Sequence, residues 1–377
     1  MNFENLKQFL EGLSTNYGIP GASCRVWHRH QQVFSHDVGV RDIETGEKMH
    51  GNEQFDVYSA SKPVTAVACM QLIEKGILSL RDPISRYFPS YAKVMQIDHA
   101  GWPHPVKKPI TLAHALSMTS GFQYKMDPPA VHKLLAEAAD TASTADFVEA
   151  MAYQPIYFEP GTHWCYNIGL DIVAGVVEKV ADMPFDEYVK KYIFDPLGMT
   201  SSCYFTDETD PKRYVYTYDM KDGKLEKRYH NGFRVAKKFV SGGASLISTA
   251  DDYVRFTDAL ACGGVGATGN RILLPCTIDM MRQNRLTTPA MRDEIPWDQC
   301  KGYGYGLGVR TMVDPTEAGS LSPVGEFGWD GLKGAYLVID PENELSLFYV
   351  EQTGMHKEYI QPRLRNLMYI GMASESK

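Results

Sequence analysis

A serine and a lysine three residues apart, Ser59 and Lys62, have the types and spacing that suit covalent catalysis. If a helix begins at Ser59, Lys62 shares its face, with the two Cβ atoms about 5–6 Å apart. Pro63 is tolerated there, because a proline in the first turn removes little hydrogen bonding. A lysine buried beside a serine has a lowered pKa and can accept the serine proton. The alternative interpretation is a helix-capping serine followed by a solvated lysine.

Tyr166 is the second residue whose position suits catalysis. It follows the turn-forming pair Pro160 and Gly161 and stands at the entry to a predicted helix over 170–180. Loops at such entries commonly present functional groups. A phenol beside an ammonium is driven toward phenolate, so Tyr166 could act as a general base. The alternative is a packed or capping tyrosine, since the chain has 22 of them.

A glycine-rich segment near the C-terminal end, Phe327-Gly-Trp-Asp-Gly-Leu-Lys-Gly, is the third candidate. Its glycines, among them Gly331, allow the backbone to approach a substrate or to line an oxyanion hole. Trp329 offers an apolar, ring-shaped wall. The alternative is a turn with a packed tryptophan.

Other catalytic schemes find little support in the sequence. GxSxG, HExxH and the P-loop pattern do not occur. His28 and His30 flank a turn, and we expect them to be surface histidines without partners nearby. Cys165, beside Tyr166, is expected to be a packed thiol. We therefore expect neither a metal nor an organic cofactor.

The elements that must position these residues change character along the chain. β-Prone runs form two predicted hairpins, one around 28–32 and one joining 334–340 to 344–350. Helical periodicity marks both chain ends and five central segments, 59–75, 112–118, 145–153, 170–180 and 186–193. The pattern predicts an α+β fold, in which an antiparallel sheet is flanked by N- and C-terminal helices and an all-helical domain is inserted.

The domain boundaries that follow are discontinuous. Residues 1–60 and 236–377 are predicted to form the α/β domain, and 61–235 the mainly helical domain. The polar, turn-rich stretch 206–238 is predicted to be a long surface excursion. We expect the substrate pocket walls to come from loops around 95–109, 122–140 and 206–238.

Composition narrows the function classes. The 377 residues contain 38 Lys and Arg and 46 Asp and Glu, a net charge of −8, which disfavours nucleic-acid binding. No window approaches 18 consecutive apolar residues, so no membrane span is expected. The first residues lack a signal-peptide pattern, and the seven cysteines are scattered without a CxxC motif. We therefore expect reduced thiols and a cytoplasmic protein.

The order of the three motifs resembles the serine β-lactamase-like superfamily, which includes class C β-lactamases, penicillin-binding proteins and family VIII carboxylesterases. The likeness covers almost the whole chain. Besides the motifs, it rests on segments 55–62, 110–122 (ITLAHALSMTSGF), 193–200 (IFDPLGMT) and 241–253. It implies an active site between the two domains, with Ser59 at the start of a central helix. It also implies an oxyanion hole formed by the backbone N–H groups of Ser59 and Leu332.

Two departures bear on the subfamily. Class C β-lactamases have Tyr-x-Asn, whereas Ile168 stands here two residues after Tyr166, and Asn167, which we expect to contact substrate, takes the intermediate position. They also have Lys-Thr-Gly where this chain has Trp329-Asp330-Gly331. Losing that lysine removes a charge-assisted contact to a β-lactam carboxylate. Trp-x-Gly is similar to family VIII carboxylesterases.

The sequence therefore predicts a serine carboxylesterase that cleaves small or short-chain esters through an acyl-enzyme on Ser59. Lys62 and Tyr166 would share the proton transfers as a coupled pair, with the base unassigned. Three alternatives stay open: a β-lactamase or D-amino-acid peptidase, an acyltransferase, and a non-catalytic binding protein on the same fold.

Overall fold

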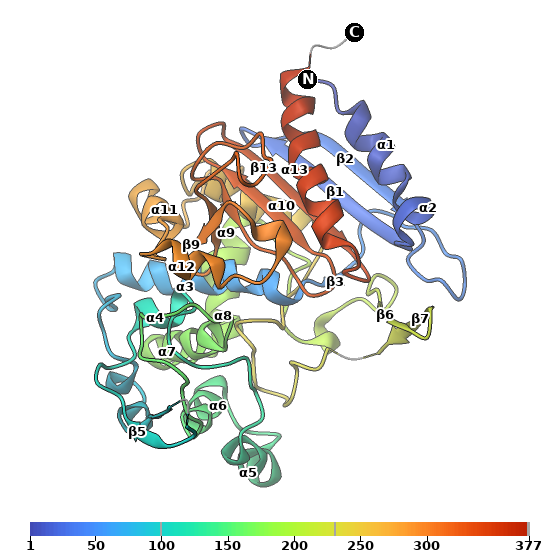
Figure 1. Ribbon diagram of the computed structural model, residues 1–377. Helices are drawn as coiled ribbons and strands as arrows, with labels where there is room; N and C mark the ends of the chain where they lie inside the picture. Colours follow the sequence, from blue (N-terminus) through green and yellow to red (C-terminus); the bar gives the residue numbers. More distant parts are fainter. Residues whose placement is uncertain (99, 230, 375–377) are drawn as a thin grey trace.

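The computed structural model, which describes residues 1–98, 100–229 and 231–374, is organised around one antiparallel sheet (Figure 1). Its strand order is β2-β1-β13-β12-β11-β10-β9, so the two ends of the chain meet at its centre. The strands are β1 (Gly21–His28), β2 (Gln31–Gly39), β9 (Tyr303–Tyr305), β10 (Arg310–Met312), β11 (Phe327–Gly328), β12 (Tyr336–Asp340) and β13 (Leu345–Glu351).

Both faces of this sheet are covered by helices. On β1, alternate residues such as Cys24 and Val26 pack against the terminal helices, while Trp27 belongs to the core on the other face. The terminal helices are α1 (Glu4–Glu11), α2 (Leu13–Tyr17) and α13 (Lys357–Ala373). The opposite face is covered by α10 (Ala250–Ala261), whose Tyr253 ring stacks on Phe348 of β13 at 4.2 Å.

Most of the central helices lie in the lower half of Figure 1, and several of them contact α7 (Gly169–Ala181). The first of these helices, α3 (Ser61–Glu74), is buried on all sides over residues 61–72. These helices are α3 (Ser61–Glu74), α4 (Leu112–Leu116), α5 (Pro129–Ala138), α6 (Thr144–Met151), α7 (Gly169–Ala181), α8 (Phe185–Val189) and α9 (Asp195–Leu197). Two more, α11 (Pro275–Arg282) and α12 (Pro289–Asp293), follow α10.

Short elements connect these layers. Three small two-stranded sheets are β3 (Phe55–Asp56) with β8 (Ile247–Ser248), β4 (Met95–Ile97) with β5 (Pro103–Pro105), and β6 (Thr217–Lys221) with β7 (Lys224–Arg228). Single turns of 3₁₀ helix occur at Tyr58–Ala60, Ile84–Arg86, Pro89–Lys93, Thr206–Glu208 and Asp298–Cys300, and a π turn at Lys190–Phe194.

The predicted α+β class, the sheet built from both chain ends and the terminal helices are confirmed. Two expectations need correction. The stretch 206–238 is not entirely irregular, because it contains the β6–β7 hairpin. His30 has a partner in Asp258: the ring Nδ1 lies 2.7 Å from Asp258 Oδ2, and the backbone N–H of His30 donates to Asp258 Oδ1. These contacts hold the β1–β2 turn against α10. Among the described residues, no helix has the length and apolar character needed to cross a membrane.

Candidate active site

Ser59 lies in the 3₁₀ turn that immediately precedes α3, and its side chain is half-buried. The residue before it, Tyr58, has a φ of +47°, a left-handed conformation that is strained for a bulky side chain. Ser61 maintains this turn: its hydroxyl donates to the Tyr58 carbonyl at 2.6 Å and accepts the Leu246 N–H at 3.0 Å. Ser61 is therefore occupied structurally, which leaves Ser59 as the serine that faces the cavity.

Lys62 is fully buried one helical turn after Ser59. Its Nζ lies 3.1 Å from Ser59 Oγ, 2.8 Å from the Gly243 carbonyl oxygen and 3.3 Å from the Tyr124 hydroxyl. Burial lowers the pKa of Lys62 to about 7, although the negative charges of Asp171 and Asp330 act to raise it. A neutral amine can donate to two of these oxygens and keep its lone pair for the serine proton.

Tyr166 approaches Ser59 from the other side. Its hydroxyl lies 2.7 Å from Ser59 Oγ, and the Trp329 indole N–H donates to the same hydroxyl at 3.4 Å. The rings of Tyr166 and Trp329 stack at 5.7 Å, and Trp297 meets the Tyr166 ring edge-on at 5.3 Å. Burial raises the pKa of Tyr166 above its ordinary value, so the phenol keeps its proton near neutral pH.

Two residues of this cluster were missed by the sequence analysis. Asp171 is a fully buried carboxylate on α7; its Oδ1 accepts the Ser241 hydroxyl and the Gly243 N–H at 3.1 Å. A Cβ on Gly243 would come within 2.8 Å of Asp171 Oδ2 and 2.9 Å of the Tyr124 hydroxyl, so this packing requires glycine. The available signal was a lone aspartate in an otherwise apolar helical run. For Tyr124, no comparable signal exists.

The loop between β11 and β12 brings backbone donors beside Ser59. A Cβ on Gly331 would lie 2.3 Å from the Val57 carbonyl oxygen, so only glycine lets this loop approach the nucleophile segment. The Gly334 N–H donates to the Gly331 carbonyl at 3.1 Å, which closes a tight turn with Leu332 at its second position. Within the part of the chain that the structure describes, the Leu332 N–H has no hydrogen-bond acceptor.

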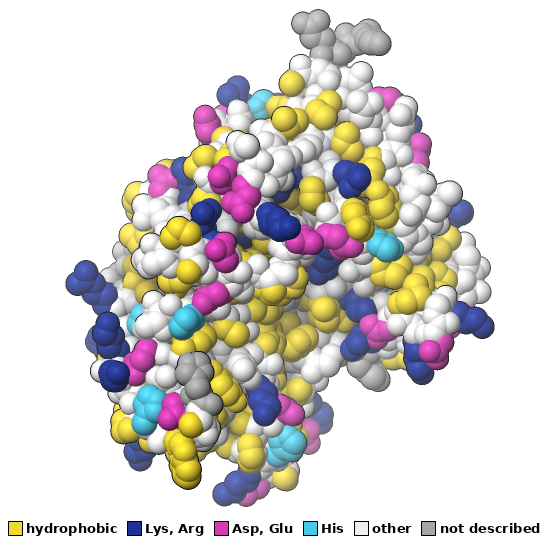
Figure 2. Space-filling view, viewed as in Figure 1, with side chains coloured by type: hydrophobic (Ala, Val, Ile, Leu, Met, Phe, Trp, Pro, Cys, Tyr) yellow, Lys and Arg dark blue, Asp and Glu magenta, His cyan; other side chains and the backbone are white. Residues whose placement is uncertain are grey.

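Ser59 and Leu332 share a cavity of about 320 Å³. Its walls come from Tyr166, Trp297, Gln299, 329–332, Gly354, Lys357 and Glu358. The loops at 95–109, 122–140 and 206–238 supply none of these lining residues, in contrast to the expectation from sequence. Figure 2 shows apolar side chains gathered in the hollow between the sheet-bearing half and the helical half.

Asn167 does not face this cavity. Its side chain is fully buried; Nδ2 donates to the Cys165 carbonyl at 2.7 Å, and Oδ1 accepts the Gly169 N–H at 2.7 Å. The carboxamide thus satisfies the first turn of α7. The structure gives Asn167 a role in orienting the segment that carries Tyr166 and places its amide away from substrate.

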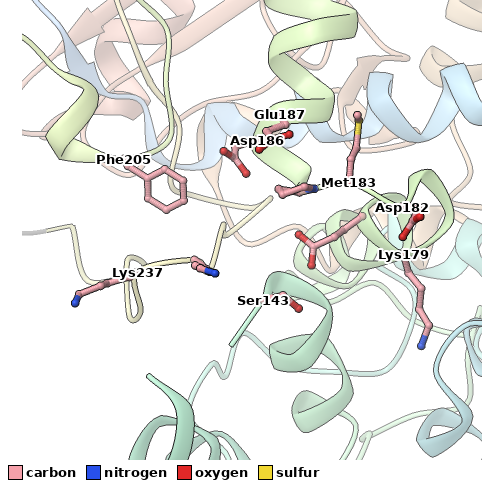
Figure 3. Close-up of a pocket in the computed structure, with 11 residues that line it drawn as sticks. Ser143, Lys179, Asp182, Met183, Asp186, Glu187, Phe205 and Lys237 are labelled. Atoms are coloured by element: carbon pink, nitrogen blue, oxygen red, sulfur yellow. The ribbon is translucent and has the colours of Figure 1, made fainter. Parts of the chain in front are cut away.

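A larger cavity, of about 630 Å³, lies beside α7 and α8 and shares no lining residue with the first (Figure 3). Two of its charged groups, Glu178 and Lys237, have structural partners. Glu178 accepts the N–H groups of Ala145 and Phe185, and Lys237 pairs with Asp140 at 2.9 Å. It contains none of the three predicted catalytic side chains.

Comparisons with known proteins show which proteins this chain resembles. A family model described as Beta-lactamase matches residues 6–361. The chain is 30% identical over 348 residues to Protein Rv1367c of Mycobacterium tuberculosis, covering 89% of this chain and 86% of that protein. It is 28% identical over 364 residues to Esterase EstB of Burkholderia gladioli, with the same coverage of 89% and 86%.

Among solved structures, EstCE1 is described as a hydrolase with promiscuous acyltransferase activity. It superposes on this chain with a TM-score of 0.80 at 25% identity, over 97% of this chain and 99% of its own.

Proposed function

Because this chain belongs to the beta-lactamase family, we propose that it is a serine hydrolase that cleaves carboxylic esters through a covalent acyl-enzyme on Ser59. The observation that carries the proposal is the position of one hydroxyl. Ser59 Oγ lies 3.1 Å from a buried amine and 2.7 Å from a buried phenol, in a cavity with tryptophan walls. This arrangement is suited to nucleophilic acyl transfer.

In the acylation step, Lys62 accepts the Ser59 proton as Oγ bonds to the ester carbonyl carbon. The carbonyl oxygen becomes an oxyanion, which the N–H groups of Ser59 and Leu332 stabilise. The bond to the alcohol oxygen then breaks, and the alcohol leaves with a proton supplied by the Lys62 and Tyr166 pair. In the second step water attacks the acyl carbon as its proton passes to the same pair. The bond to Ser59 Oγ then breaks, the pair returns the proton to Oγ, and the acid is released.

The pKa shifts support different roles for the two proton carriers. Burial lowers the pKa of Lys62 to about 7, whereas burial raises the pKa of Tyr166. We assign Lys62 as the base and Tyr166 as a neutral phenol that donates to Ser59 Oγ and relays a proton to the leaving group. The Trp329 N–H stabilises the negative charge that develops on the phenol oxygen during this relay.

The substrate class follows from the cavity walls. Trp329 replaces the lysine that would bind a β-lactam carboxylate, and its ring packs on Tyr166. A volume of about 320 Å³, at the lower end of the usual range for ligand pockets, favours small or short-chain esters. The partner is a small molecule, with no role for nucleic acid or membrane. We place the protein in the cytoplasm, since all seven cysteines are free thiols.

The test is hydrolysis of p-nitrophenyl acetate and p-nitrophenyl butyrate. Ser59→Ala is expected to abolish turnover, and a fluorophosphonate probe should label the unmodified protein but not this variant. Ser35→Ala, at an exposed serine on β2, is the matched control, which should keep the labelling. Full activity in Ser59→Ala would overturn the proposal.

A second candidate is acyl transfer to a small alcohol or amine instead of water. It is favoured by the likeness to EstCE1, whose description includes promiscuous acyltransferase activity. Product analysis with an added alcohol decides: a new ester shows transfer, and free acid alone shows hydrolysis. Efficient cephalosporin turnover would favour a β-lactamase or D-amino-acid peptidase instead.

A further inference from the structure

The peptide unit that joins Gly331 to Leu332 is held at both of its polar ends. Its N–H belongs to Leu332, which lines the Ser59 cavity, and is the proposed oxyanion donor. Its carbonyl belongs to Gly331 and accepts two hydrogen bonds, from the Gly334 N–H at 3.1 Å and from Lys357 Nζ at 2.6 Å. A lysine ammonium therefore binds the carbonyl oxygen of the same peptide unit whose N–H is the proposed oxyanion donor.

Lys357 is itself positioned by its surroundings. It is the first residue of α13, and its Nζ also lies 3.2 Å from Asp330 Oδ2. The same carboxylate oxygen accepts the Gln361 side-chain amide at 3.2 Å, one turn further along α13. The Lys357 and Asp330 side chains are only 19% and 14% exposed, so solvent screens this contact weakly.

A cation on a peptide carbonyl has two effects on the N–H of the same peptide. It withdraws electron density from the amide, which strengthens the N–H as a donor, because hydrogen bonds in a chain polarise one another. It also fixes the orientation of the peptide plane, so that no reorganisation is needed when the oxyanion forms. Both effects are largest in the transition state, where the carbonyl carbon of the substrate becomes tetrahedral and its oxygen becomes negatively charged.

We infer that Lys357 is a positioning residue of the oxyanion hole, which orients and polarises the Leu332 N–H through the Gly331 carbonyl. This inference rests on the proposed acyl transfer at Ser59. Lys357 also lines the Ser59 cavity, but its Nζ is bonded to the Gly331 carbonyl and the Asp330 carboxylate, so it acts on the reacting atoms through the backbone. Its effect should therefore fall on transition-state stabilisation and leave ground-state binding of the ester unchanged.

The experiment compares Lys357→Met and Lys357→Arg with the unmodified enzyme. For each, kcat and KM are measured on the plateau of the pH profile, because unpaired Asp330 would raise the pKa of Lys62. A boronic acid that bonds to Ser59 as a tetrahedral anion serves as transition-state analogue. We expect Lys357→Met to lower kcat about tenfold and to raise the boronate Ki by the same factor, with KM nearly constant; Lys357→Arg should recover most of both.

Lys227→Met is the matched control, because Lys227, on β7, is bridged to Asp42 and Glu44 and does not line the Ser59 cavity. It should leave the boronate Ki unchanged. An unchanged boronate Ki in Lys357→Met, or a loss that follows thermal stability alone, would overturn the inference. If the unmodified protein lacks esterase activity, the proposed function fails, and the fluorophosphonate labelling rate of Ser59 still tests Lys357. Lys357→Gln, which keeps a donor, replaces the methionine variant if that one does not fold.

Discussion

The indole N–H of Trp329 donates to the hydroxyl of Tyr166, with Nε1 3.4 Å from the phenol oxygen and the two rings stacked at 5.7 Å. These residues are 163 positions apart and belong to different halves of the molecule. The contact joins the sheet to the helical region directly beside Ser59. It gives Trp329 a part in the proton relay as well as in the cavity wall.

Trp329→Phe keeps an aromatic ring but removes this N–H. We expect kcat to fall about five- to tenfold, since a hydrogen bond to a charged or developing-charge group contributes roughly 1–1.5 kcal/mol. Steady-state kinetics on p-nitrophenyl butyrate measures the effect. Trp297→Phe is the control, because Trp297 packs on Tyr166 without donating to it. Equal losses in both variants would show that ring packing alone matters.

The protonation state of Lys62 should govern the pH profile. Its lowered pKa of about 7 means that the base is protonated and inactive at acid pH and free above neutrality. We therefore expect kcat/KM to rise with pH and to level off above about 7. In Lys62→Met, the plateau value of kcat/KM should fall roughly 10²–10⁴-fold, which is the usual contribution of a general base. A flat profile between pH 5 and 9 would contradict this assignment.

The Asp171→Asn variant tests how the negative charge of Asp171 affects the pKa of Lys62. The Asp171 charge favours the protonated amine and so raises the pKa of Lys62. Replacing it with a neutral amide should lower the Lys62 pKa and shift the rising limb of the pH profile to lower pH. Titration of kcat/KM from pH 4 to 9 measures the midpoint. An unchanged midpoint would show that Asp171 is uncharged in the resting enzyme, and a shift to higher pH would contradict the role given to its charge.

The buried carboxyl group of Glu351 should make the free energy of unfolding depend on pH. Burial raises its pKa from 4.5 to about 7, so the folded state holds the extra proton between these two values. Unfolding free energy should then fall as pH rises from 4.5 to 7, by roughly 3 kcal/mol at most. Chemical denaturation across this range should show a weaker decline in Glu351→Gln. An identical decline in both proteins would assign it to other groups.

Asn167→Ala separates a structural role from a substrate contact. Removing the bonds to Cys165 and Gly169 should destabilise the protein by about 0.5–2 kcal/mol, as losing a helix-terminal hydrogen bond does. Thermal unfolding measures this cost. KM for short esters should stay within about twofold of the parent. A large increase in KM with unchanged stability would instead show that Asn167 contacts the substrate.

Local patterns predicted the main elements because each signal lay within one segment. The β-prone residues of β1 and the apolar periodicity of α7 each lie within a single segment, and that information is local. The expected helix start at Ser59 was close: α3 begins at Ser61, after a 3₁₀ turn. The β6–β7 hairpin was missed because its strand residues, Thr217–Lys221 and Lys224–Arg228, are mostly polar.

The site was harder to predict where roles depend on distant packing. The proximity of Ser59, Lys62 and Tyr166 was inferred from motif order, whereas Asp171 and Tyr124 join them only through the fold. Asn167 looked like a ligand because of its neighbour in sequence, but its side chain points into the turn. Lys357 carries no local signal at all, since its partner carbonyl is 26 residues away.

The acyl-enzyme itself is the most direct test of the account. The protein is mixed with excess p-nitrophenyl butyrate, quenched in acid within milliseconds to seconds, and analysed by intact-mass and peptide-mapping spectrometry. The account predicts a butyryl adduct on the peptide that contains Ser59, which disappears in Ser59→Ala. Turnover without any adduct in that peptide, or an adduct on another side chain, would contradict the account.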